Sequence, residues 1–242
     1  MFKKIASGFA AIAAMGIGAV QAAPIETALS IVIDGSGSIG SFNFGVQRDA
    51  YAAVIGNNTI VKADGSVVVN VVRFSSSATV IQSAIRIEDE TDRATVISAI
   101  NGMSFTGGGT SIASGVNSGA GDMDAFLGGI ASGEFASDFR KLIDVSTDGF
   151  PNFGDPVDAA VNGAVAAGYA QINCLRIGSG SCDWNRDGVD LDFTATTFAD
   201  VEAALIRKIG QELGTTPVSE PGALALFGLG LLGLGFAARR RA

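Results

Sequence analysis

The sequence contains no histidine, which removes the commonest general base and the commonest ligand of transition metals in proteins. The P-loop pattern GxxxxGK followed by Ser or Thr, which cradles nucleotide phosphates, is absent as well. Charged residues are scarce at 17%, whereas hydrophobic residues make up 48%, so a sizeable core is available and bulk disorder is not expected. Any site in this chain must therefore be built on a folded domain and without imidazole.

Basic residues are also in short supply, because 24 aspartates and glutamates outnumber 16 lysines and arginines. Five of the basic residues and one glutamate lie in two terminal segments, residues 1–22 and 215–242. Without these segments, 11 basic residues face 23 acidic ones, which gives a net charge of −12. This balance argues against nucleic acid as a partner, and it suits an exported protein or one that attracts cations.

The first 22 residues have the organisation of a secretory signal peptide. Lys3 and Lys4 form a short basic region, and an apolar stretch follows from Ile5 to Val20. Val20 and Ala22 are small residues at positions −3 and −1, which predicts cleavage after Ala22. The alternative is an uncleaved membrane anchor, for which the apolar run is short and rich in Gly and Ala.

Residues 215–242 form a polar linker that continues into an apolar segment with a basic tip. The apolar run covers 223–238, is slightly shorter than the ~20 residues of a spanning helix, and precedes three arginines. A tail of this kind is either a C-terminal transmembrane anchor or a sorting signal that is later removed. The arginines would stay on the cytoplasmic side of the membrane.

This tail, "SEPGALALFGLGLLGLGFAARRR", resembles the PEP-CTERM sorting signal of Gram-negative bacteria. Ser219 stands where that motif has its first proline, so the match is imperfect at one position. The resemblance implies export, transient anchoring in the inner membrane, processing by an exosortase near Glu220, and release to the cell surface or extracellular matrix. A permanent anchor remains the alternative.

Between the two terminal segments, strand-like and helical sequence patterns alternate, which predicts a single α/β domain over residues 23–214. Its fold class is a doubly wound, mostly parallel sheet flanked by helices, because apolar runs of strand length alternate with helical segments. The expected strands are 28–34, 65–75, 79–87 as an edge strand, 140–149 and 170–178, and the expected helices are 42–56, 89–100, a glycine loop and helix over 107–123, 156–169 and 197–214. The two cysteines, Cys174 and Cys182, are expected to form a disulfide if the protein is exported to an oxidising compartment.

Oxygen-bearing side chains follow three of these segments at the edge where such sheets bind ligands. They are Asp34, Ser36 and Ser38 after the first strand, Thr110 in the glycine loop, and Asp148 at the end of "DVSTD". Two carboxylates and three hydroxyls, without sulfur or imidazole, favour Mg²⁺, Mn²⁺ or Ca²⁺ over Zn²⁺ or Cu²⁺. Taken singly, Asp34 and Ser36 are better explained as turn and cap residues and Thr110 as an N-cap, so the metal prediction depends on the whole set.

The same stretch, "IVIDGSGSIG", also has the GxGxxG spacing of a dinucleotide-binding turn, at Gly35, Gly37 and Gly40. That interpretation requires an acid at the end of the second strand. The second strand instead ends "VVRFSSS", so the sequence favours a cation over a phosphate at this loop.

The five oxygen-bearing residues, in this order and these contexts, resemble the metal-ion-dependent adhesion site (MIDAS) of the von Willebrand factor type A domain. The resemblance covers about residues 28–213 and implies the Rossmann-like von Willebrand factor A fold. It further implies that Ser36, Ser38 and often Thr110 coordinate the metal directly, while Asp34 and Asp148 act largely through bound water. One coordination position would stay open for a carboxylate of a partner.

A second, weaker metal motif lies in "CDWNRDGVDLD". Asp183, Asn185 and Asp187, followed by glycine, match the start of a calcium loop, but Thr194 occupies the position of the final glutamate. The motif is either a partial Ca²⁺ loop with Asp190 or Asp192 as a late ligand, or an Asx-rich surface turn beside the disulfide.

These observations predict a non-enzymatic, exported adhesion module that binds a protein or matrix partner with an exposed carboxylate. A structural component of an extracellular matrix or biofilm is the first alternative. A metal-dependent hydrolase is the second, but the sequence offers Ser36 and Ser38 no partnering base.

Overall fold

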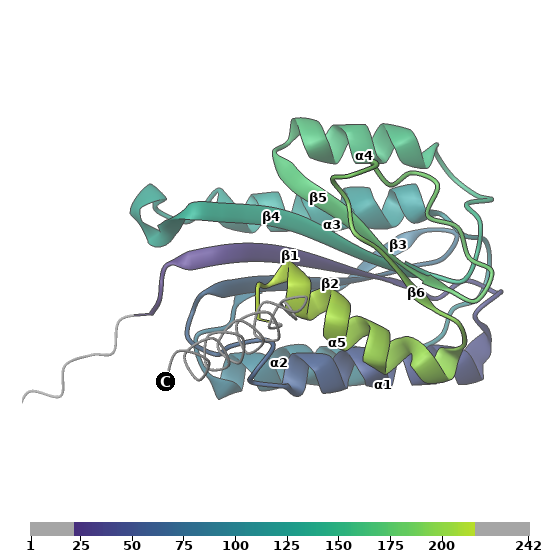
Figure 1. The fold of residues 1–242 in the computed structure, drawn as a ribbon, viewed down its shortest axis with the longest axis horizontal. Coiled ribbons are helices and arrows are strands. Elements are labelled where there is room, and N and C mark those ends of the chain that lie inside the picture. Colours follow the sequence, from purple (N-terminus) through teal and green to yellow (C-terminus); the bar gives the residue numbers. More distant parts are fainter. Residues whose placement is uncertain (1–21, 216–242) are drawn as a thin grey trace, which may run out of the picture.

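Six strands form one sheet at the centre of the protein, seen in a computed structural model that describes residues 22–215 (Figure 1). The strands are β1 (Ile25–Asp34), β2 (Val67–Phe74), β3 (Ala78–Arg86), β4 (Phe135–Thr147), β5 (Tyr169–Ile177) and β6 (Asp192–Ala195), in the spatial order β3-β2-β1-β4-β5-β6. All neighbours pair in parallel except β2 and β3. This mostly parallel sheet confirms the predicted fold class. The predicted signal peptide before residue 22 and the sorting segment lie outside the described residues.

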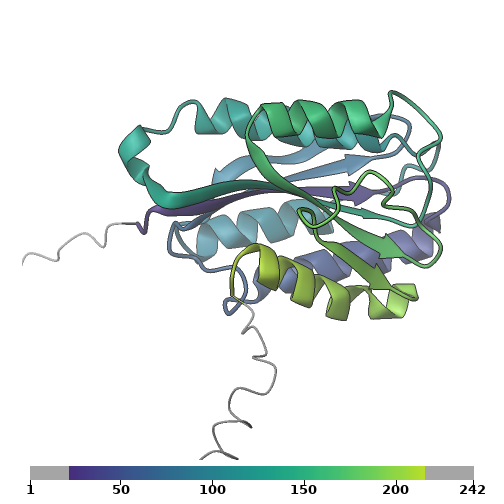
Figure 2. The ribbon, with the colours of Figure 1, turned by 45° about the horizontal axis from the view of Figure 1, so that its top comes forward.

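Helices cover both faces of the sheet (Figures 1 and 2). On one face lie α1 (Gly40–Gly56), α2 (Glu90–Asn101) and α5 (Val201–Glu212), and on the other lie α3 (Ile112–Leu127) and α4 (Val157–Ala166). Two 3₁₀ turns, Ser132–Glu134 and Phe198–Asp200, precede β4 and α5. No helix among residues 22–215 has the length and apolar character needed to cross a membrane. The predicted C-terminal apolar run is not part of that range.

The central strand β1 shows why both faces need helices. Its residues are buried at every position except Glu26, so it presents apolar side chains on both sides. Leu29, Ile31 and Ile33 join the core under α1, α2 and α5, whereas Val32 joins the core under α3 and α4. This alternation follows from the two-residue period of a strand.

The short strand β6 was not predicted from the sequence. It contains four residues, of which only Ala195 is buried, and it pairs in parallel with β5 from Cys174 opposite Asp192. A segment this short and polar has no apolar pattern of its own, so its strand conformation depends on the edge that β5 provides. The predicted edge strand over 79–87 is confirmed as β3, which is partly exposed along its length.

The disulfide between Cys174 and Cys182 is present, as predicted, and both cysteines are buried. Trp184, the only tryptophan, is 6% exposed and packs in the same apolar cluster as the two cysteines. The loop after β5 is therefore tied to the domain core by a covalent bond and an aromatic side chain.

A buried ionic cluster lies between the sheet and α5, and the sequence analysis did not anticipate it. Lys208 forms ion pairs with Asp144 of β4 and with Glu212, one turn further along α5, and all three side chains are fully buried. Tyr51 donates a hydrogen bond of 2.8 Å to Asp144. One ammonium thus faces two carboxylates, and burial raises the pKa of Glu212 to about 8.

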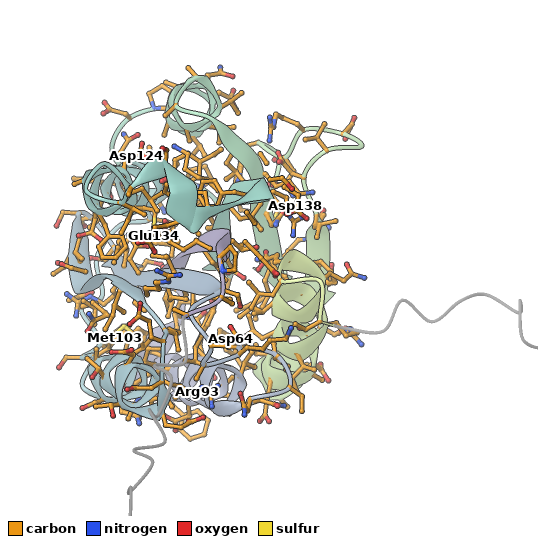
Figure 3. The ribbon with its side chains drawn as sticks, turned by 90° about the vertical axis from the view of Figure 1, so that its left-hand side faces the viewer. Asp64, Arg93, Met103, Asp124, Glu134 and Asp138 are labelled. Carbon is orange, nitrogen blue, oxygen red and sulfur yellow. A yellow bond between two sulfur atoms is a disulfide. The ribbon has the colours of Figure 1, made fainter. Side chains whose placement is uncertain are left out.

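Figure 3 views the end of the molecule that holds the amino ends of the parallel strands. The side chains labelled there include the carboxylates of Asp64, Asp124, Glu134 and Asp138. The residues of the predicted metal set lie at the opposite end, where β1 and β4 finish. Because parallel strands bring their carboxyl ends to one edge, residues far apart in sequence meet there.

Candidate metal centre

Asp34 is the last residue of β1 and is held by three parts of the chain. Its Oδ1 accepts a hydrogen bond of 2.7 Å from the backbone N–H of Ser36, and its Oδ2 accepts one of 2.6 Å from the hydroxyl of Thr147. Gln47 of α1 donates to the Asp34 backbone carbonyl at 2.9 Å. Asp34 is fully buried, and the contacts with Ser36 and Thr147 fix its carboxylate in one orientation.

Ser36, Ser38 and Asp148 form a connected set beside Asp34. The hydroxyl oxygens of Ser36 and Ser38 lie 3.2 Å apart, and the Ser38 hydroxyl donates to Asp148 Oδ1 at 2.7 Å. Asp148 directly follows β4, the strand that pairs with β1. The pairing of these strands therefore brings together side chains that are separated by 110 residues in sequence.

Thr110 reaches the same place from the loop before α3. The Thr110 and Ser38 hydroxyls both lie next to Gly149, since a Cβ built on Gly149 would lie 3.2 Å from Ser38 Oγ and 3.4 Å from Thr110 Oγ1. Asn152 accepts a hydrogen bond of 2.9 Å from the Thr110 backbone N–H, and the Asn152 N–H donates to the Thr110 carbonyl at 3.1 Å. All five predicted residues thus gather at one edge of the sheet.

The glycines of "IVIDGSGSIG" allow the loop after β1 to pack closely against the glycine loop that carries Thr110. The N–H of Gly37 donates to the carbonyl of Gly108 at 2.9 Å, and the N–H of Gly107 donates to the carbonyl of Gly35 at 2.9 Å. A Cβ on Gly37 would lie 3.2 Å from the Gly108 oxygen, tighter than most such contacts. The glycine loop that carries Thr110 is thereby fastened to the loop that carries Ser36 and Ser38.

Four supporting residues were missed by the sequence analysis: Gln47, Ser76, Thr147 and Asn152. Ser76 accepts a hydrogen bond of 2.8 Å from the Gly109 N–H, next to Thr110. Only the position of Thr147, directly before Asp148 in "DVSTD", offered a signal in the sequence. The others lie on elements whose proximity to the site depends on the tertiary fold.

The charges of this site call for a cation. Burial raises the pKa of Asp34 to about 6, and the nearby charge of Asp148 adds to this rise. Burial also raises the pKa of Asp148. Among residues 22–215, neither carboxylate takes part in an ion pair with Lys or Arg. Two crowded carboxylates with three hydroxyls and no basic partner fit a hard divalent metal ion.

The residues of the second motif do not gather in the same way. Asp183 and Asp187 are exposed, and Asn185 donates to the carbonyl of Leu191 at 3.2 Å. The two candidate late ligands are engaged by basic side chains, Asp190 by Arg186 in an ion pair of 2.7 Å and Asp192 by Arg176 in one of 2.9 Å. Within the described part of the chain, no group of three or more Asp, Glu, Cys or His side chains is placed to hold a metal. The partial calcium loop stays a prediction without an assembled ligand set.

Comparisons with known families agree with this architecture. The family model described as von Willebrand factor type A domain matches residues 29–185, and the model described as PEP-CTERM protein-sorting motif matches residues 217–241. No curated protein matches the sequence significantly.

Solved structures with the same fold include a matrix protein and an adhesin. Proximal thread matrix protein 1 from the mussel byssus is 18% identical with a TM-score of 0.63, over 79% of this chain and 49% of that chain. Another structure of that protein is described with a zinc-occupied MIDAS motif, at 17% identity and a TM-score of 0.62, over 79% and 48%. The pilus adhesin SpaC from Lactobacillus rhamnosus GG is 15% identical with a TM-score of 0.58, over 78% and 30%. The chain spans half or less of these proteins, and at such identities the likeness shows the fold alone.

Proposed function

The chain belongs to the von Willebrand factor type A domain family and carries a PEP-CTERM sorting motif, and from this we propose that it is an exported, metal-dependent adhesion module. In this proposal a divalent cation binds an acidic group of a protein or matrix partner. The cation is held by Asp34, Ser36, Ser38, Thr110 and Asp148. The observation that carries the proposal is the convergence of five oxygen-bearing side chains, two of which are carboxylates without a Lys or Arg partner among residues 22–215.

Each side chain has a role in the proposed site. The hydroxyls of Ser36, Ser38 and Thr110 would hold the ion directly, and the carboxylates of Asp34 and Asp148 would balance its charge, largely through water. When bound, the metal supplies a positive centre with an open position for a partner's carboxylate. Mg²⁺ is the expected ion, with Mn²⁺ or Ca²⁺ as alternatives, because the donors are all hard oxygens. The zinc described for the mussel protein belongs to that protein.

A non-enzymatic role is part of the proposal. The whole sequence lacks histidine, and the half-buried carboxylate that accepts the Ser38 hydrogen bond, Asp148, belongs to the proposed metal set. Similarity to an adhesin and to a matrix protein is consistent with binding, or with a structural place in a matrix. The sorting motif implies export through a membrane-anchored stage with a C-terminal tail. We propose exosortase processing and a final place at the cell surface or in the extracellular matrix.

Titration calorimetry of the purified protein with Mg²⁺, Mn²⁺, Ca²⁺ and Zn²⁺ tests the metal site. We expect a single tight site that is abolished in Asp34→Asn and retained in Asp187→Asn, a matched change at an exposed carboxylate of the second motif. Equal binding by the wild type and Asp34→Asn would overturn the proposed site. Loss of binding in Asp187→Asn instead would assign the metal to the second motif.

A further inference from the structure

A groove of about 690 Å³ opens beside the candidate metal centre and shares Asp148 with it. Its walls come from the first turns of α1, the end of β5 and the segment between β6 and α5. The side chains that give it an apolar character are Phe42, Val46, Ile177 and Phe198. Asp148 is the only charged residue of the lining within the part of the chain that the structure describes. The volume lies within the range of ordinary ligand sites.

Three phenylalanines are exposed around the same edge of the sheet, and we call them the aromatic rim. Phe42, Phe150 and Phe153 are 83%, 60% and 55% exposed, more than any other large hydrophobic residue among those described. Phe42 lies in the first turn of α1, soon after Ser38, and Phe150 follows Asp148 by two residues. Phe153 packs against Gly109, next to Thr110.

The three side chains of the aromatic rim belong to none of the apolar clusters that form the core of the domain. Exposed aromatic side chains that gather at one place mark surfaces that become buried in a complex, because they gain free energy when water is removed. The groove and the aromatic rim both adjoin the residues of the proposed metal set. A partner that reached the metal would therefore cover them.

We propose that the groove and the aromatic rim receive a protein segment in which an acidic side chain is flanked by a large apolar one. This inference rests on the proposed metal-dependent function: the carboxylate binds the metal and the apolar side chain enters the groove. Since Asp148 belongs to both places, the acidic and apolar residues must be close neighbours in the partner's sequence.

Charge and polarity favour such a segment over an acidic polysaccharide. The domain carries 11 basic and 23 acidic residues between its terminal signals, so a polymer with many carboxylates is repelled except at the metal. The hydroxyls of a sugar would also lose hydrogen bonds with water in an apolar groove. A segment with one carboxylate beside an apolar side chain avoids both the charge repulsion and the loss of hydrogen bonds with water.

The test uses synthetic peptides with one central Glu and three residues on either side of it. In the reference peptide all six flanking residues are Ser. In the others, one of these six positions carries Phe or Leu instead. Binding to the purified protein is measured by fluorescence anisotropy, with Mg²⁺ or with chelator. A polyuronate oligosaccharide is the competing probe. The protein variants are Phe42→Ser in the groove and Val189→Ser, a matched change at a 44% exposed residue outside it. Calorimetry with Mg²⁺ is run on every variant.

We expect Mg²⁺-dependent binding of peptides with Phe or Leu beside the Glu, and at least about tenfold weaker binding of the all-Ser peptide, since burial of a large apolar side chain accounts for that factor. Phe42→Ser should weaken the Phe and Leu peptides by about the same factor and leave Mg²⁺ binding unchanged, whereas Val189→Ser should change neither. Four outcomes would each overturn this inference. Two of them are equal binding of all peptides and no effect of Phe42→Ser. The other two are binding of the polyuronate alone and no binding of any probe to the Mg²⁺-loaded protein. A protein that binds no metal would overturn the proposed function itself.

Discussion

The hydroxyl of Thr147 donates a hydrogen bond of 2.6 Å to Oδ2 of Asp34 and so links the carboxyl ends of β4 and β1. Both residues are fully buried. Because Asp34 Oδ1 is already engaged by the Ser36 N–H, the two oxygens of this carboxylate are held from different sides. Thr147 is therefore a positioning residue for the candidate metal centre.

Thr147→Val keeps the shape of the side chain and removes the hydroxyl, so we expect Mg²⁺ affinity to fall by about 10-fold or more, as for other groups that orient metal ligands. The folded state should lose about 1–3 kcal/mol, because a buried carboxylate oxygen loses its donor. Calorimetry and urea unfolding measure the two effects. Thr147→Ser retains the donor and should preserve Mg²⁺ affinity. A Val variant with unchanged affinity would show that the hydrogen bond does not orient Asp34.

Metal removal should lower the stability of the wild-type protein. Mg²⁺ at 100 times its dissociation constant stabilises the folded state by about 2.7 kcal/mol, which corresponds to a rise in Tm of roughly 5–10 °C for a domain of this size. Differential scanning calorimetry with Mg²⁺ and with chelator measures the difference. Asp34→Asn should melt at the same temperature under both conditions. A wild-type Tm that does not respond to any divalent ion would contradict the metal site.

Glu212 should make stability depend on pH. Its pKa is raised by burial from the usual 4.5 to about 8, so the folded state favours the protonated form. The contribution of Glu212 to stability is fully present below about pH 4.5 and is lost as the pH rises towards 8. Compared with the wild type, Glu212→Gln should therefore become increasingly more stable across this window.

Urea unfolding at several pH values, with chelator present, measures this difference. The control is Glu202→Gln, which changes an exposed residue on the same helix and should parallel the wild type. If the difference between Glu212→Gln and the wild type is constant with pH, Glu212 is ionised in the folded state throughout, and Lys208 balances both of its carboxylate neighbours.

The disulfide should stabilise the loop after β5. Replacing Cys174 and Cys182 together by Ala opens a loop between residues eight positions apart, and we expect a loss of about 2–3 kcal/mol from the added chain entropy of the unfolded state. Denaturant unfolding followed by the fluorescence of Trp184, the sole tryptophan, measures the change. Addition of reductant to the wild type should reproduce it, and an unchanged midpoint in both experiments would contradict the prediction.

Most of the secondary structure could be predicted because it depends on local patterns of apolar and polar residues. The apolar run that ends at Asp34 and the small-residue helix after Thr110 both appear in the structure close to their expected bounds. Helix α5 begins at Val201 rather than at 197, because a 3₁₀ turn occupies the first positions. Strand β6 was missed because its residues carry no pattern that distinguishes them from a loop.

The sequence by itself determined the α/β class, the disulfide pair and the five oxygen-bearing residues of the candidate metal centre, since these depend on hydrophobic period, residue type and order along the chain. Only the tertiary structure decided which residues support them. Thr147 meets Asp34 across 113 positions, and Lys208 lies buried between Asp144 and Glu212 although a lone lysine on a helix predicts exposure. Hydrogen bonds and ion pairs of this kind form only when helices and strands pack together. The residues around each partner in the sequence therefore do not predict which distant residue it will contact.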